Sequence, residues 1–217
     1  MPRLPFITFE GSEGSGKSTQ ADKLAARLQR SDLPYILTRE PGGTPIGESI
    51  RELLQFVSHN SDMTAETELL LFEASRSQLV REVIKPALER GMCVIADRFF
   101  DSTSVYQGAA RKLDRETIKR LNEFAVGSYI PDITFVLDVD AATAESRMKR
   151  ELRKADRMEQ QPAEFYQCVR SGYRELATRE PKRIVLIDGA GDVDDIEKEI
   201  WKTLCSRFSV LAKISSI

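Results

Sequence analysis

Cysteine and histidine are scarce in this sequence of 217 residues, which contains three cysteines and one histidine. Cys93, Cys168 and Cys205 stand far apart and form no CxxC or Cys/His spacing, so neither a disulfide framework nor a zinc site is indicated. His59 falls in an expected loop without a pattern of catalytic partners. A hydrolase or nuclease built on histidine acid–base chemistry is therefore disfavoured, and the cysteine usage suits a reducing cytosol.

The sequence also lacks an excess of either charge and any apolar run of membrane-spanning length. Its 32 Lys and Arg residues against 34 Asp and Glu give a net charge of −2, which leaves no global positive field for a nucleic-acid polymer. The segment 1–9 carries one Arg and lacks the apolar stretch and cleavage site of a signal peptide. We expect one cytoplasmic domain over residues 1–217, with no membrane partner.

Five short apolar segments alternate with longer segments of helical period. The expected strands are Pro5–Glu10, Tyr35–Glu40, Met92–Asp97, Ile133–Asp138 and Arg183–Asp188. Strands that are apolar on both faces favour a parallel sheet covered by helices on two sides, and the connections are long enough for helical crossovers. The sequence therefore predicts a three-layer α/β fold.

Two helices and one charged segment stand out between these strands. Core-facing spacing in the first expected helix is carried by Ala21, Leu24, Ala25 and Leu28. A longer helix is expected from Thr64 to Arg90, with Gly91 after its end. The residues of about 147–160 concentrate basic side chains and are the expected lid, although such a run is also typical of a solvated helix face.

The segment after the first expected strand matches the P-loop pattern GxxxxGK[ST]. Its residues are Gly11, Ser12, Glu13, Gly14, Ser15, Gly16, Lys17 and Ser18, followed by Thr19. Glycines allow backbone N–H groups to point at a phosphate, the helix N-terminus adds positive potential, and the lysine reaches the β- and γ-phosphates. The alternative is a Gly/Ser-rich turn before an ordinary helix. We expect a nucleotide triphosphate such as ATP to bind here.

Two acidic residues bear on this phosphate site. Asp97 ends the third expected strand, where its carboxylate would approach Mg²⁺ beside the Ser18 hydroxyl. Glu13 lies inside the phosphate loop, where an acid repels its ligand unless it faces another group such as a sugar hydroxyl. A solvated position for Glu13 is the alternative.

A phosphoryl acceptor that is itself a nucleotide needs a second anion site, and several arginines on separate elements could form it. These are Arg39, Arg51, Arg76 and Arg98. Phe72 and Arg76 are one helical turn apart, so an aromatic plate and a guanidinium could address one base. Thr103, Tyr106 and Gln107 repeat this spacing, and an amphipathic packing face is the alternative for both sets.

Four further motifs closely resemble those of bacterial thymidylate kinases, in the same order along the chain. They are Arg39-Glu40-Pro41-Gly42-Gly43-Thr44, Asp97-Arg98-Phe99 through Ser102, Tyr106-Gln107-Gly108, and Asp156-Arg157-Met158-Glu159. The resemblance implies transfer of a phosphoryl group from ATP to dTMP, giving ADP and dTDP for dTTP biosynthesis, with Mg²⁺. It also implies a P-loop fold with five parallel strands in the order 2-3-1-4-5, and a homodimer.

The same resemblance implies roles for individual residues. Arg39, Arg51 and Arg98 would hold the acceptor phosphate, close to Pro41, and Phe72 would stack on thymine. Arg76, Thr103 and Gln107 would address the edge of the base. Tyr106 would crowd the 2′ position of the sugar, and Glu13 would organise the groups between sugar and phosphates. The resemblance thus predicts Lys17, Glu13 and Arg98 in catalysis, and Ser18 and Asp97 as metal ligands.

The catalytic cation of the lid is expected to be Arg153 or, failing that, Arg150. They lie about one helical turn apart, whereas Arg157 adjoins Asp156 and could form a local ion pair. This sequence has Leu152 and Arg153 where the family commonly has an Arg followed by Gly. If neither arginine serves, the cation must be sought among Arg39, Arg51 and Arg98.

Two rival functions share part of this pattern. A kinase for another nucleoside monophosphate would carry the same phosphate loop and metal site and would differ in the acceptor pocket. A nucleotide-dependent switch would also carry the loop, but the guanine-reading Asn-Lys-x-Asp motif of GTPase switches is absent from the sequence.

Overall fold

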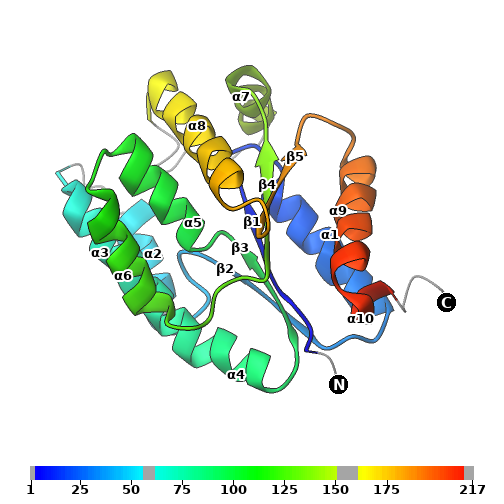
Figure 1. Cartoon of the computed structure of the whole chain (residues 1–217). Coiled ribbons are helices and arrows are strands. Elements are labelled where there is room, and N and C mark those ends of the chain that lie inside the picture. The colour runs from blue at the N-terminus through cyan, green and yellow to red at the C-terminus, as the bar shows by residue number, and fades with distance from the viewer. Residues whose placement is uncertain (1–2, 56–61, 151–160, 213–217) are drawn as a thin grey trace.

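The computed structural model describes residues 3–55, 62–150 and 161–212, and a parallel sheet of five strands lies at its centre (Figure 1). The strand order is β2-β3-β1-β4-β5, as predicted. The strands are β1 (Phe6–Glu10), β2 (Tyr35–Arg39), β3 (Cys93–Asp97), β4 (Ile133–Asp138) and β5 (Ile184–Asp188). Each expected strand is present, and the expected ends agree within one residue.

The parallel arrangement brings the carboxyl ends of all five strands to one edge of the sheet, which is the upper edge in Figure 1. β1 pairs with β3 in a register that places Phe9 opposite Asp97. The loop after β1 and the carboxylate that ends β3 are therefore neighbours. This register, set by the apolar pattern of two strands far apart in the sequence, positions the site.

One face of the sheet is covered by α1 (Lys17–Arg30), α9 (Val193–Arg207) and α10 (Ser209–Ala212). The four residues expected to face the core from α1 are buried there; they are Ala21, Leu24, Ala25 and Leu28. They pack with Ile7 and Phe9 of β1. Since side chains alternate along a strand, Phe6, Thr8 and Glu10 point to the opposite face.

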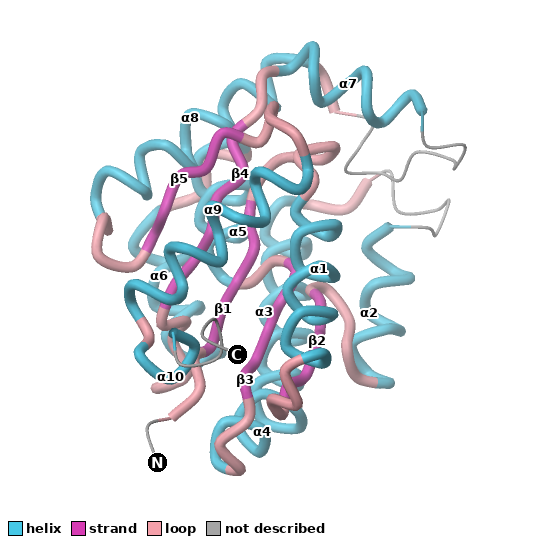
Figure 2. The backbone as a smooth tube through the Cα atoms, turned by 90° about the vertical axis from the view of Figure 1, so that its right-hand side faces the viewer, coloured by secondary structure: helices cyan, strands magenta, loops and turns pink. Residues whose placement is uncertain are grey.

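The opposite face is covered by a longer series of helices (Figure 2). In chain order these are α2 (Pro45–Gln55), α3 (Ala65–Leu79), α4 (Lys85–Glu89), α5 (Phe100–Thr103), α6 (Arg115–Val126) and α8 (Ala163–Arg179). Two π-helical segments join this series, η1 (Val80–Ile84) between α3 and α4 and η2 (Ser104–Ala110) after α5. α7 (Ala141–Arg150) follows β4.

The expected helix from Thr64 to Arg90 is present as α3, η1 and α4 in succession. Thr64 caps it, because its side chain accepts a hydrogen bond from the backbone N–H of Thr67, and Gly91 follows its end with φ +74°. The wider π-helical turn precedes Pro86, which has no N–H for the hydrogen bond that an α-helix requires.

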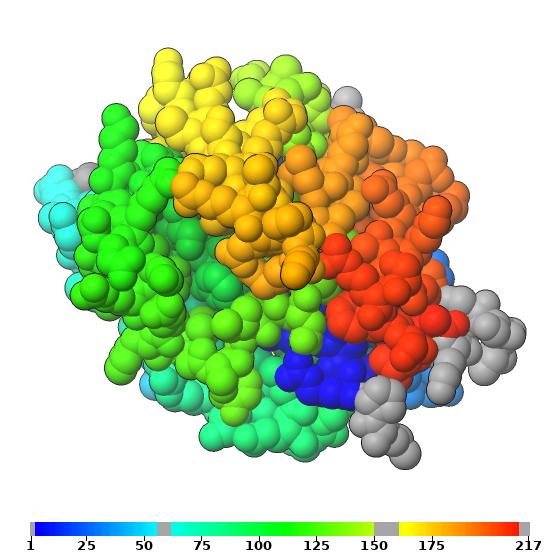
Figure 3. Space-filling model, in the orientation of Figure 1, coloured from blue at the N-terminus to red at the C-terminus, as the bar shows by residue number. Residues whose placement is uncertain are grey.

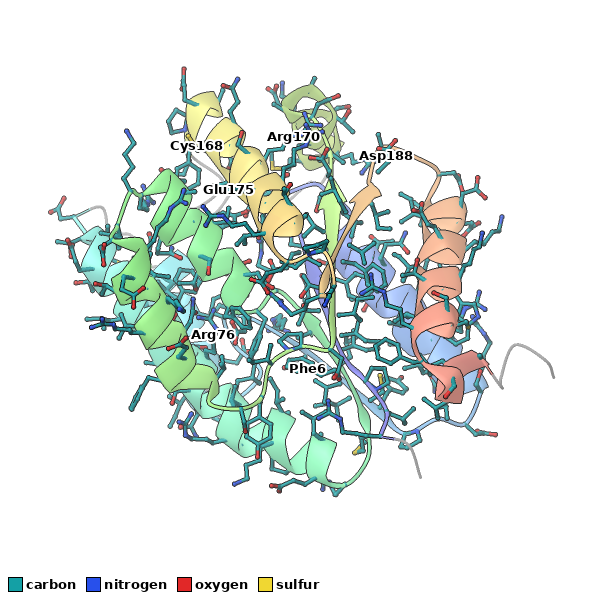
Figure 4. The ribbon with its side chains drawn as sticks, in the orientation of Figure 1. Phe6, Arg76, Cys168, Arg170, Glu175 and Asp188 are labelled. Atoms are coloured by element: carbon teal, nitrogen blue, oxygen red, sulfur yellow. The ribbon has the colours of Figure 1, made fainter. Side chains whose placement is uncertain are left out.

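The three cysteines form no disulfide, and Cys93 is buried whereas Cys168 is exposed on α8 (Figure 4). Burial raises the pKa of the Cys93 thiol to about 12, so this side chain is an inert part of the core. Within the described ranges, no helix combines the length and apolarity needed to span a bilayer.

Candidate active site

The phosphate loop is a compact turn between β1 and α1, and glycines make it possible. Gly11, Gly14 and Gly16 have φ values of +141°, +70° and +92°, which side chains rarely tolerate. A Cβ on Gly14 would lie 2.6 Å from the carbonyl oxygen of Ala144 in α7. α1 begins at Lys17, so its first N–H groups face the space where a phosphate would bind.

A cleft of about 680 Å³ opens above this loop at the carboxyl edge of the sheet. The seven residues from Glu13 to Thr19 line one end of the cleft, whereas Gly11 and Ser12 are not among its lining residues. The cleft continues past Asp97 and Arg98 to an arginine-bearing and aromatic wall. That wall includes Arg39, Pro41, Arg51, Phe72, Thr103, Tyr106 and Gln107.

Lys17 is held inside the phosphate loop. Its side chain is buried, and Nζ donates a hydrogen bond to the carbonyl oxygen of Ser12 at 3.2 Å. Burial lowers the pKa of Lys17 and the nearby Arg98 acts in the same direction, while Asp97 and Glu13 oppose them. A phosphate bound in the cleft would place negative charge near Lys17 and so favour its charged form.

The predicted metal ligands lie in contact. The Ser18 hydroxyl donates to Oδ2 of Asp97 at 2.5 Å, and Oδ1 of Asp97 is buried without a hydrogen-bond partner in the described part of the chain. One free carboxylate oxygen beside a hydroxyl fits Mg²⁺, which commonly takes few protein ligands and completes its shell with phosphate oxygens and water. Among the residues that the structure describes, no group of three or more His, Cys, Asp and Glu side chains is arranged to hold a metal ion.

Arg98 lies at the centre of the site and has a strained backbone. Its φ is +69°, a conformation that costs free energy for any residue with a Cβ. Nη2 donates to Oε1 of Glu13 at 2.8 Å, and the guanidinium carbon lies 5.0 Å above the ring of Tyr106. The structure therefore places Glu13 in an ion pair that is mostly buried, so the solvated alternative for this residue is wrong.

The other two expected phosphate ligands lie on the outer side of the cleft. Arg39, at the end of β2, pairs with Glu48 of α2 at 2.9 Å and is exposed. Arg51 of α2 donates from Nη1 to the carbonyl oxygen of Pro41 at 2.9 Å. Both line the cleft with Pro41, so their guanidinium groups are within its reach.

The expected base-binding residues are brought together only in part. Phe72 lines the cleft, and so do Thr103, whose hydroxyl is buried without a hydrogen-bond partner in the described residues, and Gln107. Gln107 is oriented by a hydrogen bond from Nε2 to Oε1 of Glu68 at 2.7 Å. An unpartnered hydroxyl on a cleft wall is costly unless a ligand satisfies it.

Arg76 is not among the residues that line the cleft. It is 1% exposed, and its guanidinium donates to the carboxylates of Glu40 and Glu73 and to Asn122. Burial raises the pKa of Glu40 to about 7, although Arg76 acts in the opposite direction. The assignment of Arg76 to the base edge stays a prediction.

Sequence reasoning missed Arg147 of α7 as a cleft residue. Its Nη1 lies 3.4 Å from the carbonyl oxygen of Gly14 and 3.3 Å from that of Ser15, and its side chain lines the cleft. It belongs to the basic run that predicted a lid, but nothing in its spacing separated it from its neighbours. Gly189, Gly191 and Val193, which follow β5, line the same cleft.

The two arginines expected as lid cations, Arg150 and Arg153, have side chains outside the described part of the structure. Arg150 is the last residue of α7 and its side chain is not described, and Arg153 falls in the segment 151–160, outside the described residues. Their catalytic role stays a prediction from the sequence.

A phosphate loop and an arginine-bearing wall that share one cleft define a P-loop phosphotransferase. A family model described as thymidylate kinase matches residues 9–200. This chain belongs to the thymidylate kinase family.

Individual relatives agree with this assignment. A thymidylate kinase of Kosmotoga olearia is 48% identical over 198 residues, which cover 91% of this chain and 93% of the relative. One of Fervidobacterium nodosum is 48% identical over 197 residues, covering 91% and 96%. The crystal structure of thymidylate kinase from Ehrlichia chaffeensis superimposes with a TM-score of 0.76 at 38% identity, over 94% of this chain and 99% of that one.

Proposed function

We propose that this chain transfers the γ-phosphoryl group of ATP to dTMP and releases ADP and dTDP, a step toward dTTP. The observation that carries the proposal is the continuous cleft. At one end, Lys17 and the N-terminus of α1 suit the triphosphate, and at the other end Phe72, Thr103 and Gln107 suit a base. Arg98 lies between the two ends, where the acceptor phosphate would meet the γ-phosphate.

The charged and metal-binding side chains of the cleft have distinct roles in this reaction. Lys17 neutralises charge on the β- and γ-phosphates, and Arg98, with Arg39 and Arg51, holds the acceptor phosphate. Ser18 and Asp97 would hold Mg²⁺, which when bound neutralises charge on the phosphates. Glu13 orients Arg98 toward the acceptor phosphate.

The walls of the cleft set selectivity. The Tyr106 hydroxyl is fixed on Glu13, so its ring is a rigid wall that favours a deoxyribose over a ribose. Arg147, which lines the cleft as Gly189 and Gly191 do, is a candidate to contact the adenine of ATP, because a guanidinium can stack on an aromatic base.

We also propose a cytoplasmic homodimer. Leu70 of α3 and Phe124 of α6 are 56% and 77% exposed, and α2, α3 and α6 pack side by side. Their cyan and green surfaces meet at the left of Figure 3. A second copy would bury these apolar side chains, which are costly to expose in one patch. Sedimentation of the wild type and of Phe124→Glu checks this, and a wild-type monomer would contradict it.

Comparison of acceptors tests the proposed function. ATP turnover is measured with dTMP, dUMP, dCMP, dGMP and AMP at equal concentrations. We expect the highest kcat/KM with dTMP. Equal or better turnover of a purine monophosphate would overturn the choice of acceptor, and ATP hydrolysis unaffected by every acceptor would favour a switch protein.

A further inference from the structure

Glu10 is a fully buried carboxylate at the end of β1, one residue before the phosphate loop, and the mechanism above does not use it. It accepts four hydrogen bonds. The backbone N–H groups of Phe99 and Ser102 donate to Oε1 at 2.8 and 3.3 Å. The hydroxyls of Ser102 and Tyr173 donate to Oε2 at 2.6 and 2.8 Å. Four donors fill the acceptor capacity of a carboxylate, so the ionised form of this buried acid is fully hydrogen-bonded.

The same two hydroxyls contact Arg98. Nη1 of Arg98 donates to Ser102 Oγ at 3.1 Å and lies 3.4 Å from Tyr173 Oη. A guanidinium can only donate and an ionised carboxylate can only accept, so each hydroxyl accepts a hydrogen bond from Arg98 and donates one to Glu10. Burial, with Asp101 as a second cause, raises the pKa of Glu10 to about 6. The acid is therefore mainly ionised at neutral pH.

Backbone hydrogen bonds also connect β1 with the turn that contains Arg98. Arg98 has φ +69°, and a residue in that conformation keeps it only where its surroundings fix it. The N–H of Arg98 donates to the carbonyl oxygen of Phe9 at 2.9 Å, and the next N–H, of Phe99, donates to Glu10. β1 thus holds the strained turn from both sides.

We propose that Glu10 is a positioning residue for phosphoryl transfer, which fixes Arg98 toward the acceptor phosphate through Ser102, Tyr173 and the N–H of Phe99. This inference rests on the proposed function, because it takes Arg98 as the ligand of that phosphate. Glu10 itself touches no substrate. Its effect on the acceptor phosphate passes through Arg98.

A double-mutant cycle tests the inference. Glu10→Gln keeps the shape of the side chain but puts an NH₂ group where an acceptor is required. We expect its KM for thymidylate to rise about tenfold, with KM for ATP changed less than twofold. In an Arg98→Ala background, the same substitution should have no further effect on kcat/KM for thymidylate. Additive effects in the cycle, or an equal rise of both KM values, would overturn the proposal.

Tyr173→Phe gives a second route if Glu10→Gln does not fold, because it removes one hydroxyl and keeps the ring. It should raise KM for thymidylate in the same selective way and should also have no effect without Arg98. Unchanged KM for thymidylate in Tyr173→Phe and Ser102→Ala together would contradict the network.

The matched control is Asp132→Asn, because Asp132, which directly precedes β4, bonds the first residue of β1, at the end opposite Glu10. Asp132 accepts from the N–H of Phe6 at 2.7 Å, far from Arg98, so its loss should lower Tm and leave both KM values unchanged. Acceptor comparison with the wild type tests the proposed function separately from the role of Glu10. If another monophosphate proves to be the acceptor, the proposed function fails, and the cycle measured with that acceptor still decides the role of Glu10.

Discussion

The Tyr106 hydroxyl donates to the Glu13 carboxylate, with Oη 3.0 and 2.9 Å from its two oxygens. The same carboxylate accepts from Nη2 of Arg98, so one acid fixes an aromatic ring and a guanidinium on the cleft wall. Burial raises the pKa of Tyr106, and the neighbouring Arg98 only partly offsets it, which keeps the phenol a hydrogen-bond donor at neutral pH. An acid in the phosphate loop thus organises the acceptor side of the cleft.

Lys17→Ala should remove most phosphoryl transfer, because Lys17 neutralises charge that develops on the phosphates. We expect kcat to fall by about 10²–10³, the loss typical of one removed electrostatic donor. Steady-state turnover is measured beside a thermal melt, in which Tm should change little. A variant with normal turnover would show that the phosphate site is wrongly assigned.

Phe72→Ala should weaken binding of the acceptor base. Stacking on an aromatic side chain contributes about 1–3 kcal/mol per base, so KM for thymidylate should rise about 5- to 150-fold. KM for ATP is the internal control and should stay constant, because the adenine end of the cleft lies on the other side of the phosphate loop. A change in KM for ATP alone would contradict the assignment.

Thr103→Val should separate stability from binding. The Thr103 hydroxyl is buried and finds no hydrogen-bond partner among the described residues, and valine has almost the same shape. The variant should therefore gain about 1–3 kcal/mol of unfolding free energy. If the hydroxyl serves the acceptor, affinity for thymidylate should fall at the same time. Urea unfolding and equilibrium binding measure the two effects. A variant that is more stable and binds thymidylate as well as the wild type would show that the hydroxyl is no ligand.

The lid prediction concerns Arg150 and Arg153. An arginine that arrives on a closing segment can contribute about 10³–10⁵ in kcat. We expect Arg153→Ala, or failing that Arg150→Ala, to lower kcat sharply with little change in KM for thymidylate, as for an interaction made mainly in the transition state. If both single variants and the double variant keep near-normal kcat, the cation must be one of Arg39, Arg51 and Arg98.

Glu40 predicts a pH dependence of stability. Its pKa rises from 4.5 to about 7 on folding, mainly through burial, so the folded state binds its proton more tightly than the unfolded state does. The unfolding free energy should therefore fall as pH rises from about 4.5 to about 7, by at most about 3 kcal/mol from this group.

The test compares urea unfolding of the wild type and Glu40→Gln at pH 5 and pH 7. The variant should lose less stability over this interval, whatever its absolute stability. Glu10 contributes in the same direction up to about pH 6, which leaves a smaller slope in the variant. An identical slope in both proteins would show that Glu40 does not titrate there.

Placement of the side chains predicted to bind the base needed the tertiary structure. Phe72 and Arg76 share a helix face, which suggested that both meet one ligand, but only Phe72 lines the cleft. Arg76 is held outside the cleft lining by Glu73 of its own helix, by Glu40 after β2 and by Asn122 of α6. Local periodicity cannot foresee that competition, because the partners are up to 46 residues away.

The sequence by itself determined the five strands, their parallel order through the family resemblance, and the phosphate loop, because apolar patterning and the glycine spacing are local. The sequence also predicted that Ser18 and Asp97 lie close together, because one follows the loop after the first strand and the other ends the third strand. Only the tertiary structure decided that Glu13 is paired with Arg98 and Tyr106, that Arg147 reaches the phosphate loop, and that Glu10 is bonded to the turn of Arg98. The physical reason is that a buried polar group must find its partner in three dimensions, and burial fixes which partner remains available.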